Sequence, residues 1–319
     1  FTSPAGNDLP FDEDLCIQGR NFSNKIWNAL RLVKGWKVDE SQAQCAACAV
    51  SVEWFSSRLN ATIQLLEDHY DKFRISSALM VAYKLIWDDF CSWYLEMIKP
   101  GYQQPMDRIT YNRTVEFFEK LMQVLHPFMP FITEEIWHRL RDRDDDDCIM
   151  NSRMPQLTGY DQGLLNRFEI AREVTVTVRK IRAEKNIPFK NSILLYVKKN
   201  HGEEPDTYFD SIVQKLCNIS TLGYTEEKMD DAISFIVKST EFFIPHSEAI
   251  DVEAEIEKLE QELDYSRRFL TTVMKKLGNE RFISNAPRKV VELEEKKKAD
   301  AEGKIKVIEV QLAELRREA

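Results

Sequence analysis

The chain has 319 residues, 30% of them charged, and a formal net charge of −9. A chain of this length can form two or three domains, each with its own core. The negative charge excludes an overall field that attracts nucleic acid or anionic lipid, so any polyanion must be bound by local patches.

The first residues, FTSPAGNDLPFDEDL, are acidic and contain two prolines, and they show no signal peptide. No run in the chain approaches the ~20 apolar residues that a membrane span requires. Because the chain also begins without methionine, we expect a piece of a longer cytoplasmic protein that has no contact with membranes.

The first strong pattern is an amphipathic helix over residues 20–34. Its apolar stripe comprises Phe22, Ile26, Ala29, Leu30 and Val33. The opposite face has no acid and carries amides, an indole and cations, namely Arg20, Asn24, Trp27, Asn28, Arg31 and Lys34. These groups suit stacking on a base and donation to base edges and phosphates. A helix between two neighbours, with Trp27 simply buried, fits the pattern equally well.

Further helices are expected at 41–70 (capped by Asp39 or Ser41), 74–98, 110–125 and 131–140. They predict an all-helical bundle over residues 1–155. Cys45 and Cys48 form one Cys-x-x-Cys pair in the Ala-rich run SQAQCAACAV, with no second pair or nearby histidine to complete a zinc site. We therefore expect no metal, and we expect reduced, inert core thiols.

Residues 156–250 have a different character and predict a small α+β module. The module opens with a basic helix over 164–185, whose cations include Arg172, Arg179 and Arg182. β-branched or alternating runs follow at 193–197, 219–224, 233–237 and 242–244, with a helix expected at 208–217.

Residues 251–319 carry heptad-like apolar spacing in two segments separated by about nine residues. This pattern predicts an antiparallel coiled-coil hairpin. Seven acids and one lysine in 251–264 give a net charge of −6, whereas ten cations and four glutamates in 265–298 give +6. The predicted tip is therefore basic and suits a polyanion, although a tip that docks on an acidic protein surface remains an alternative.

Several stretches resemble the region that follows the catalytic domain in class I aminoacyl-tRNA synthetases of the valine, isoleucine and leucine subgroup. They are RNFSNKIWNALRLV, WDDFCSWYLEMIKP, HPFMPFITEEIW and IRAEKNIP. The segment KLGNERFISNAPRKVVELEEKK is similar to the C-terminal arm of the valyl-tRNA synthetases. The resemblance covers essentially the whole chain.

The resemblance implies a mainly α fold, with a helical-bundle anticodon-binding domain, an α+β linking module and a coiled-coil tRNA-binding arm. It implies that the face of helix 20–34 reads the anticodon of valine tRNA and that the arm grips the outer corner of the tRNA. Candidate contacts with the tRNA backbone are Arg172, Arg179, Arg182, Lys275, Lys276, Arg281, Arg288 and Lys289.

The motifs of the family's ATP site are not found in this sequence, so the catalytic and editing domains, with ATP and Mg²⁺, are expected upstream of it. We expect no catalytic residue and no cofactor in this chain, no DNA as a partner, and a monomer. Two other interpretations stay open: a non-enzymatic helical and coiled-coil module that binds protein, and a fragment of an isoleucyl-type synthetase.

Overall fold

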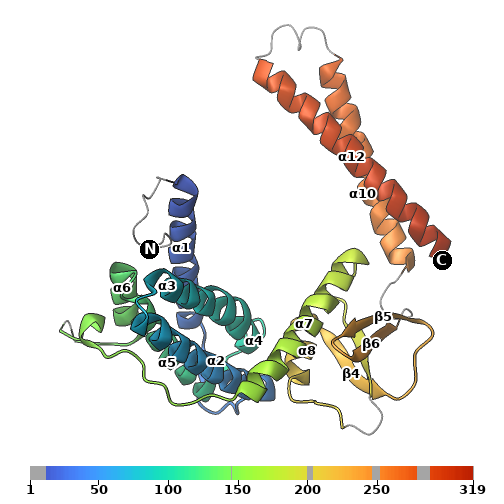
Figure 1. The fold of residues 1–319 in the computed structure, drawn as a ribbon. Helices are drawn as coiled ribbons and strands as arrows, with labels where there is room; N and C mark the ends of the chain where they lie inside the picture. Colours follow the sequence, from blue (N-terminus) through green and yellow to red (C-terminus); the bar gives the residue numbers. More distant parts are fainter. Residues whose placement is uncertain (1–11, 145, 200–203, 246–251, 279–287, 319) are drawn as a thin grey trace. The chain divides into compact units, whose positions relative to one another are not determined.

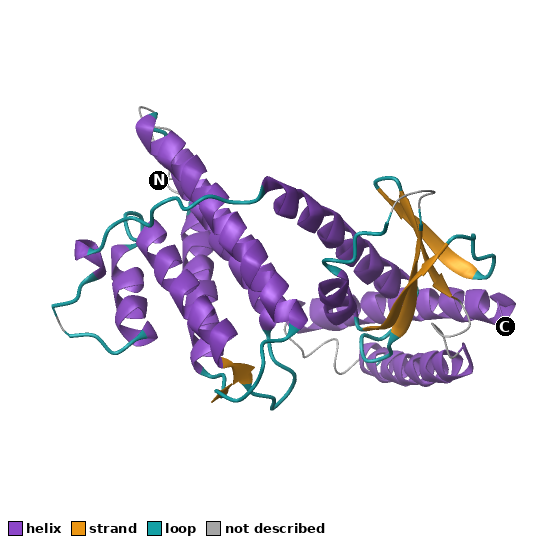
Figure 2. Ribbon diagram, turned by 90° about the horizontal axis from the view of Figure 1, so that it is seen from below, coloured by secondary structure: helices purple, strands orange, loops and turns teal. Residues whose placement is uncertain are grey.

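The structure, a computed structural model, describes residues 12–144, 146–199, 204–245, 252–278 and 288–318. These residues are mostly helical, with one four-stranded sheet and one short strand pair (Figure 2). The chain divides into two compact units, Phe1–Asp230 with Ser234–Ile244, and Asp231–Ile233 with Pro245–Ala319. The boundary expected near 250 thus lies close to a boundary between units, whereas the one expected at 155 falls inside the first unit.

The first unit opens with a helical bundle (Figure 1). Its helices are α1 (Glu13–Lys34), α2 (Ala46–Asp71), α3 (Ile75–Lys84), α4 (Leu95–Ile98), α5 (Arg108–Leu125) and α6 (Pro130–Leu140). The predicted apolar stripe of α1 is buried, as its spacing indicates. The helix extends from the expected segment back to Glu13, where Asp12 accepts a hydrogen bond from the Asp14 N–H at 2.8 Å.

A ten-residue π-helical segment, η1 (Leu85–Tyr94), lies between α3 and α4. The Ser92 hydroxyl donates to the Trp87 carbonyl, five residues earlier, at 2.8 Å. Tyr94 of this segment packs against Phe55 of α2, with ring centroids 4.8 Å apart, and its hydroxyl lies 2.8 Å from that of Thr114. The segment therefore supplies the aromatic centre of the bundle core.

The connection between α1 and α2 is tied to the connection before α5. Strand β1 (Val38–Asp39) pairs in parallel with β2 (Met106–Asp107). Cys45, rather than Asp39 or Ser41, caps α2, and its sulfur accepts from the Cys48 N–H at 3.0 Å. Cys45 and Cys48 form a disulfide and Cys45 is exposed, so the expectation of reduced core thiols is wrong for this pair.

The α+β part consists of α7 (Gln162–Glu184), α8 (Asp210–Cys217) and a sheet. The strands are β3 (Ile193–Lys198), β4 (Ile219–Thr225), β5 (Ala232–Val237) and β6 (Thr240–Pro245), in the order β4-β3-β6-β5. Strand β3 is parallel to β4 and antiparallel to β6. Helix α7 also packs on α2, where Phe168 meets Trp54 with ring centroids 4.0 Å apart. This aromatic contact explains why bundle and module form one compact unit.

The second unit contains two long helices, α10 (Val252–Leu277) and α12 (Arg288–Glu318), which pack against each other. Leu263 lies against Ile308 and Leu312, and Lys276 pairs with Glu294 at 3.7 Å. Since a later residue of α10 meets an earlier residue of α12, the two helices run antiparallel. Ser266 and Glu294, two polar residues within the segments of heptad-like apolar spacing, are both buried.

Candidate nucleic-acid interface

The polar face of α1 lies at the surface of the first unit. The side chains of Arg20, Asn24, Asn28, Arg31 and Lys34 are exposed, and that of Trp27 is partly exposed. Within the described residues, none of these five exposed side chains makes a hydrogen bond or an ion pair. Their donors and acceptors are thus available to a ligand, which favours the surface interpretation of this helix over the buried one.

Trp27 has a neighbour that sequence reasoning missed. The Arg139 guanidinium of α6 lies 5.2 Å from the centre of a Trp27 ring, and Arg139 Nε donates to Glu135 at 2.6 Å. One face of the indole is therefore covered by a cation that is itself held in place. A base can stack on the opposite face only, unless Arg139 moves.

A second aromatic group lies beside the apolar edge of α1. Tyr83 and Trp87 stack with ring centroids 5.6 Å apart, Phe22 of α1 meets Tyr83 at 4.6 Å, and Lys25 lies 5.3 Å from the centre of a Trp87 ring. Tyr83, Trp87 and Lys25 are all partly exposed. The spacing of four between Tyr83 and Trp87 signals stacking on one helical face, but it does not show that this pair lies next to α1.

The cations of α7 are used within the protein to different degrees. Arg182 is only 4% exposed and donates to the carbonyls of Pro188, Asn191 and Asn218 at 3.0–3.1 Å. Its burial explains why its pKa is lowered. A buried guanidinium whose two terminal nitrogens both donate to carbonyls holds the chain around it, and this use within the protein disfavours Arg182 as a contact with the tRNA backbone.

The two other arginines of α7 remain closer to solvent. Arg179 is exposed, although it donates twice to the Leu216 carbonyl, at 3.1 and 3.3 Å. Arg172 is partly exposed, lies 3.5 Å from Glu169 and 5.4 Å from the centre of a Trp93 ring. Each would have to share its guanidinium between an internal partner and a phosphate.

The cations of the two long helices also differ in whether a carboxylate of the protein lies beside them. Lys275 and Lys276 at the end of α10 are exposed, and Lys276 lies 3.7 Å from Glu294. Lys297 donates to Glu294 at 2.7 Å, which is the main reason that the pKa of Glu294 is lowered. Of the other predicted contacts, Arg281 and the side chains of Arg288 and Lys289 lie outside the described residues.

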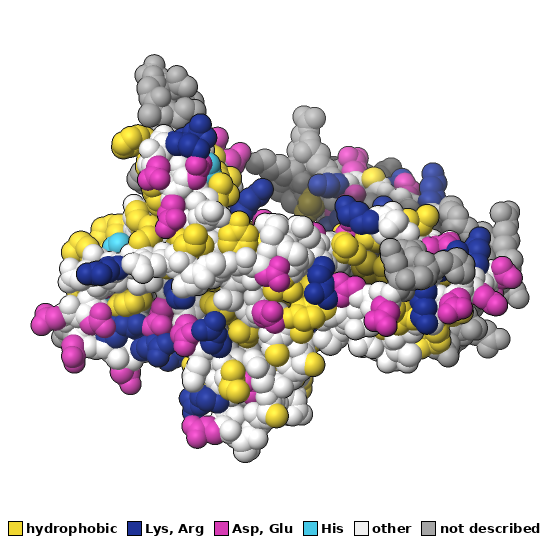
Figure 3. Space-filling model, turned by 60° about the horizontal axis from the view of Figure 1, so that its bottom comes forward, with side chains coloured by type: hydrophobic (Ala, Val, Ile, Leu, Met, Phe, Trp, Pro, Cys, Tyr) yellow, Lys and Arg dark blue, Asp and Glu magenta, His cyan; other side chains and the backbone are white. Residues whose placement is uncertain are grey.

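Figure 3 shows one face of the molecule in space-filling form, with Lys and Arg side chains interspersed among Asp and Glu. No broad field of a single sign covers that face. This mixture agrees with the net charge of −9, and it means that a nucleic acid would be held through small groups of cations.

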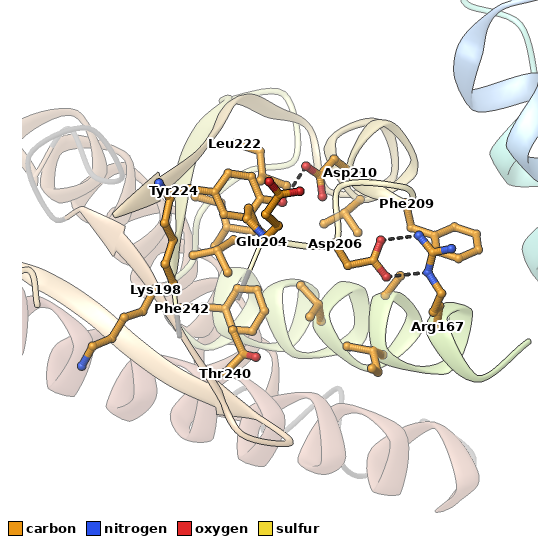
Figure 4. A pocket seen from close by; sticks show the side chains of 18 residues that line it. Arg167, Lys198, Glu204, Asp206, Phe209, Asp210, Leu222, Tyr224, Thr240 and Phe242 are labelled. Atoms are coloured by element: carbon orange, nitrogen blue, oxygen red, sulfur yellow. Dashed lines mark hydrogen bonds and ion pairs between the residues drawn. The ribbon is translucent and has the colours of Figure 1, made fainter. Parts of the chain in front are cut away.

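A pocket of about 260 Å³ lies between α7, α8 and the sheet (Figure 4). At its rim Arg167 pairs with Asp206 through two hydrogen bonds, and Tyr224 donates to Asp210 at 2.7 Å. The pairing lowers the pKa of Asp206, whereas burial raises that of Asp210. Arg167, Asp206, Tyr224 and Asp210 are thus partnered within the protein, and the lining carries three carboxylates beside three cations, so it has no excess of positive charge for a phosphate.

Among the described residues, no group of three or more His, Cys, Asp or Glu side chains is placed to hold a metal ion. None of the helices within the described ranges is long and apolar enough to cross a membrane.

Two family models match the chain. Residues 52–198 match the anticodon-binding domain of tRNA ligase, and residues 251–316 match the valyl tRNA synthetase tRNA binding arm. The first match runs from α2 to the end of β3 and does not include α1. The second covers α10 and nearly all of α12.

Curated relatives cover nearly the whole chain. A valine–tRNA ligase of Parabacteroides distasonis and one of Christiangramia forsetii are each 51% identical to it over 315 residues. A valine–tRNA ligase of Enterococcus faecalis is 33% identical over 328 residues. These matches cover 98–99% of the chain but only 36–37% of the relatives' own length, where they correspond to the C-terminal region.

Proposed function

Since this chain belongs to the valine–tRNA ligase family, whose C-terminal region it matches, we propose that it binds valine tRNA through two separate surfaces. One surface is the polar face of α1 in the helical bundle, and the other is the basic end of the α10–α12 pair. The observation that carries the proposal is that one chain matches both an anticodon-binding domain and a tRNA binding arm.

The bundle is proposed to read the anticodon. Valine codons begin with GU, so the cognate anticodons have A in the middle and C at the third position. Single-stranded bases are recognised by stacking and by hydrogen bonds to their exposed edges. Asn24, Asn28 and Arg31 are exposed and supply donors and acceptors, while the face of Trp27 opposite Arg139 would supply a stacking surface. Arg20 and Lys34 extend the same face toward the phosphates.

The α10–α12 pair is proposed to be an antiparallel coiled coil that grips the outer corner of the tRNA. Its leucine and isoleucine contacts and its antiparallel ion pairs support this arrangement. Lys275, Lys276, Arg281, Arg288 and Lys289 would contact phosphates near the tip, without reading sequence. The bundle would then distinguish valine tRNA from other tRNAs, and the arm would strengthen binding of the tRNA without distinguishing its sequence. Arg172 and Arg179 of α7 remain secondary candidates for the backbone.

For the whole enzyme we propose the activity that the relatives' name states, the ligation of valine to its tRNA. ATP and Mg²⁺ would serve that reaction, and we propose that they bind in parts of the protein other than this chain. The task of the present residues is to hold the tRNA so that its acceptor end reaches those parts. We further propose a monomer in the cytoplasm.

A titration of this chain with purified tRNA species tests the proposal. At low salt we expect tighter binding of valine tRNA than of isoleucine tRNA or of an unrelated tRNA of equal length. Tighter binding of isoleucine tRNA would support the isoleucyl interpretation instead. Equal affinity for all three tRNAs would contradict the proposal that this chain recognises the anticodon of valine tRNA. A dimer seen by light scattering would contradict a helix pair formed within one chain.

A further inference from the structure

Cys45 and Cys48 stand apart from the other cysteines of the chain. They form a disulfide across the first turn of α2, with Cα atoms 5.1 Å apart. Cys45 is exposed, whereas Cys48 is only 5% exposed. The pair thus combines one sulfur that an external reagent can reach with a second sulfur held directly behind it.

The position of Cys45 favours its reactive, ionised form. It is the N-cap of a 26-residue helix, and its sulfur accepts a hydrogen bond from the Cys48 N–H at 3.0 Å. The first turn of α2 contains no acidic residue. The positive end of a helix and a backbone donor both stabilise a thiolate, which is the nucleophile in disulfide exchange.

The surroundings also allow the bond to open without unfolding. The preceding residues are held independently, since Gln44 donates to the Thr110 hydroxyl at 3.0 Å and β1 pairs with β2. A reduced Cys45 can still cap the helix through the same N–H. Both redox states are therefore compatible with the same backbone.

We propose that Cys45 and Cys48 form a reversible dithiol–disulfide site that exchanges with disulfides of low-molecular-weight thiols. The Cys45 thiolate attacks one sulfur of the disulfide RSSR, which forms the Cys45–SR bond and releases one thiolate RS⁻. Cys48 then loses its proton to water and attacks the Cys45 sulfur, which forms the internal disulfide and releases a second RS⁻. The protein dithiol loses two electrons, and RSSR gains them to become two RSH.

The other cysteines supply matched controls. Cys16 is exposed and has no disulfide partner, so it can form an adduct but cannot resolve it. Cys91 and Cys217 are buried, and burial raises the pKa of the Cys91 thiol to about 12 and that of Cys217 to about 11. These two should remain unmodified in the folded protein.

The test uses the full chain in buffers of defined ratios of reduced to oxidised glutathione. After an acid quench, free thiols are alkylated and the peptides are quantified by mass spectrometry. The peptide that contains Cys45 and Cys48 should pass reversibly from two alkylated thiols to an internal disulfide, without a glutathione adduct. Cys16 should show an adduct only.

Two variants assign the roles. In C48S we expect a stable glutathione adduct at Cys45, formed about tenfold faster than the adduct at Cys16. In C45S the buried Cys48 should react no faster than Cys91. The proposal is overturned if the wild-type pair keeps a stable adduct, if no internal disulfide forms, or if Cys45 of C48S reacts no faster than Cys16. The measurement on the wild-type protein tests the proposal even if a variant fails to fold.

Discussion

The guanidinium of Arg139 lies 5.2 Å from the centre of a Trp27 ring, so the only tryptophan on the polar face of α1 has one face occupied by a cation. The contact joins α6 to α1 and restrains the indole. A restrained ring loses less entropy when a base stacks on it, which is an advantage for a binding surface.

We expect W27A to weaken binding of valine tRNA by about 1–3 kcal/mol, the range for one base stacked on an aromatic side chain. W27F should keep most of the affinity because it keeps an aromatic face. The measurement is a titration at fixed salt. F73A, which removes an aromatic side chain that is 88% exposed in another part of the bundle, is the control. Equal losses in W27A and F73A would argue against a specific stack.

At the basic end of the second unit, K275A combined with K276A should make the salt dependence of tRNA binding shallower. Each phosphate contact contributes just under one unit to the slope of log affinity against log salt, so the expected change is about 1–2 units. R267A is the matched control, because Arg267 is paired with Glu309 at 2.8 Å. An unchanged slope in the double variant would exclude these lysines as phosphate contacts.

Arg182 leads to a prediction about folding instead of binding. R182M removes every donor that the guanidinium gives to three carbonyls. The carbonyls of Pro188 and Asn218 then keep only their backbone N–H partners, Asn191 and Ile193. We expect a loss of about 2–4 kcal/mol in the free energy of unfolding, measured with urea. The salt slope of tRNA binding should not change. Wild-type stability together with a shallower slope would restore Arg182 as a phosphate contact.

Asp89 of η1 makes stability depend on pH. Burial is the main reason that its pKa rises from 3.8 to about 6, and Arg58, whose Nε lies 4.0 Å away, opposes this rise. The folded state thus holds a proton that the unfolded state releases. The resulting stabilisation is complete below pH ~4 and is lost as the pH rises through about 6.

D89N removes this titration. We expect it to raise the free energy of unfolding by up to about 3 kcal/mol at pH 7 and by about half as much at pH 5. Urea unfolding at the two pH values measures the difference, with D88N as the neighbouring control. A D89N protein that is less stable than wild type at pH 7 would show that the carboxylate is needed as a charged partner of Arg58.

The spacing of apolar residues predicted the structure correctly where an element buries one face. The buried side chains of α1 are those expected from the spacing of Phe22, Ile26 and Val33. The four strands lie where the β-branched or alternating runs predicted them, and α8 lies within the helix expected at 208–217. The polar face of α1 is likewise exposed as a helical projection requires.

The remaining features depend on partners that are distant in the chain. A basic helix looks the same whether its arginines meet water or carbonyls, so the sequence could not separate Arg182 from Arg172. The start of α2 was misplaced because cysteine is a less common cap than aspartate or serine. Arg139 reaches Trp27 from more than a hundred residues away in sequence, which no local pattern reveals.

The most direct test of the central claim is a comparison of three proteins on two tRNAs. The proteins are the wild type, N24A combined with N28A, and K275A combined with K276A. The tRNAs are valine tRNA and the same tRNA with its middle anticodon base replaced, each titrated at two salt concentrations. We predict that the base replacement weakens binding to the wild type and to the lysine variant, but not to the asparagine variant. We also predict that only the lysine variant has a shallower salt dependence. A penalty for the base replacement that is equal in all three proteins, or absent from the wild type, would contradict the assignment of the anticodon to α1.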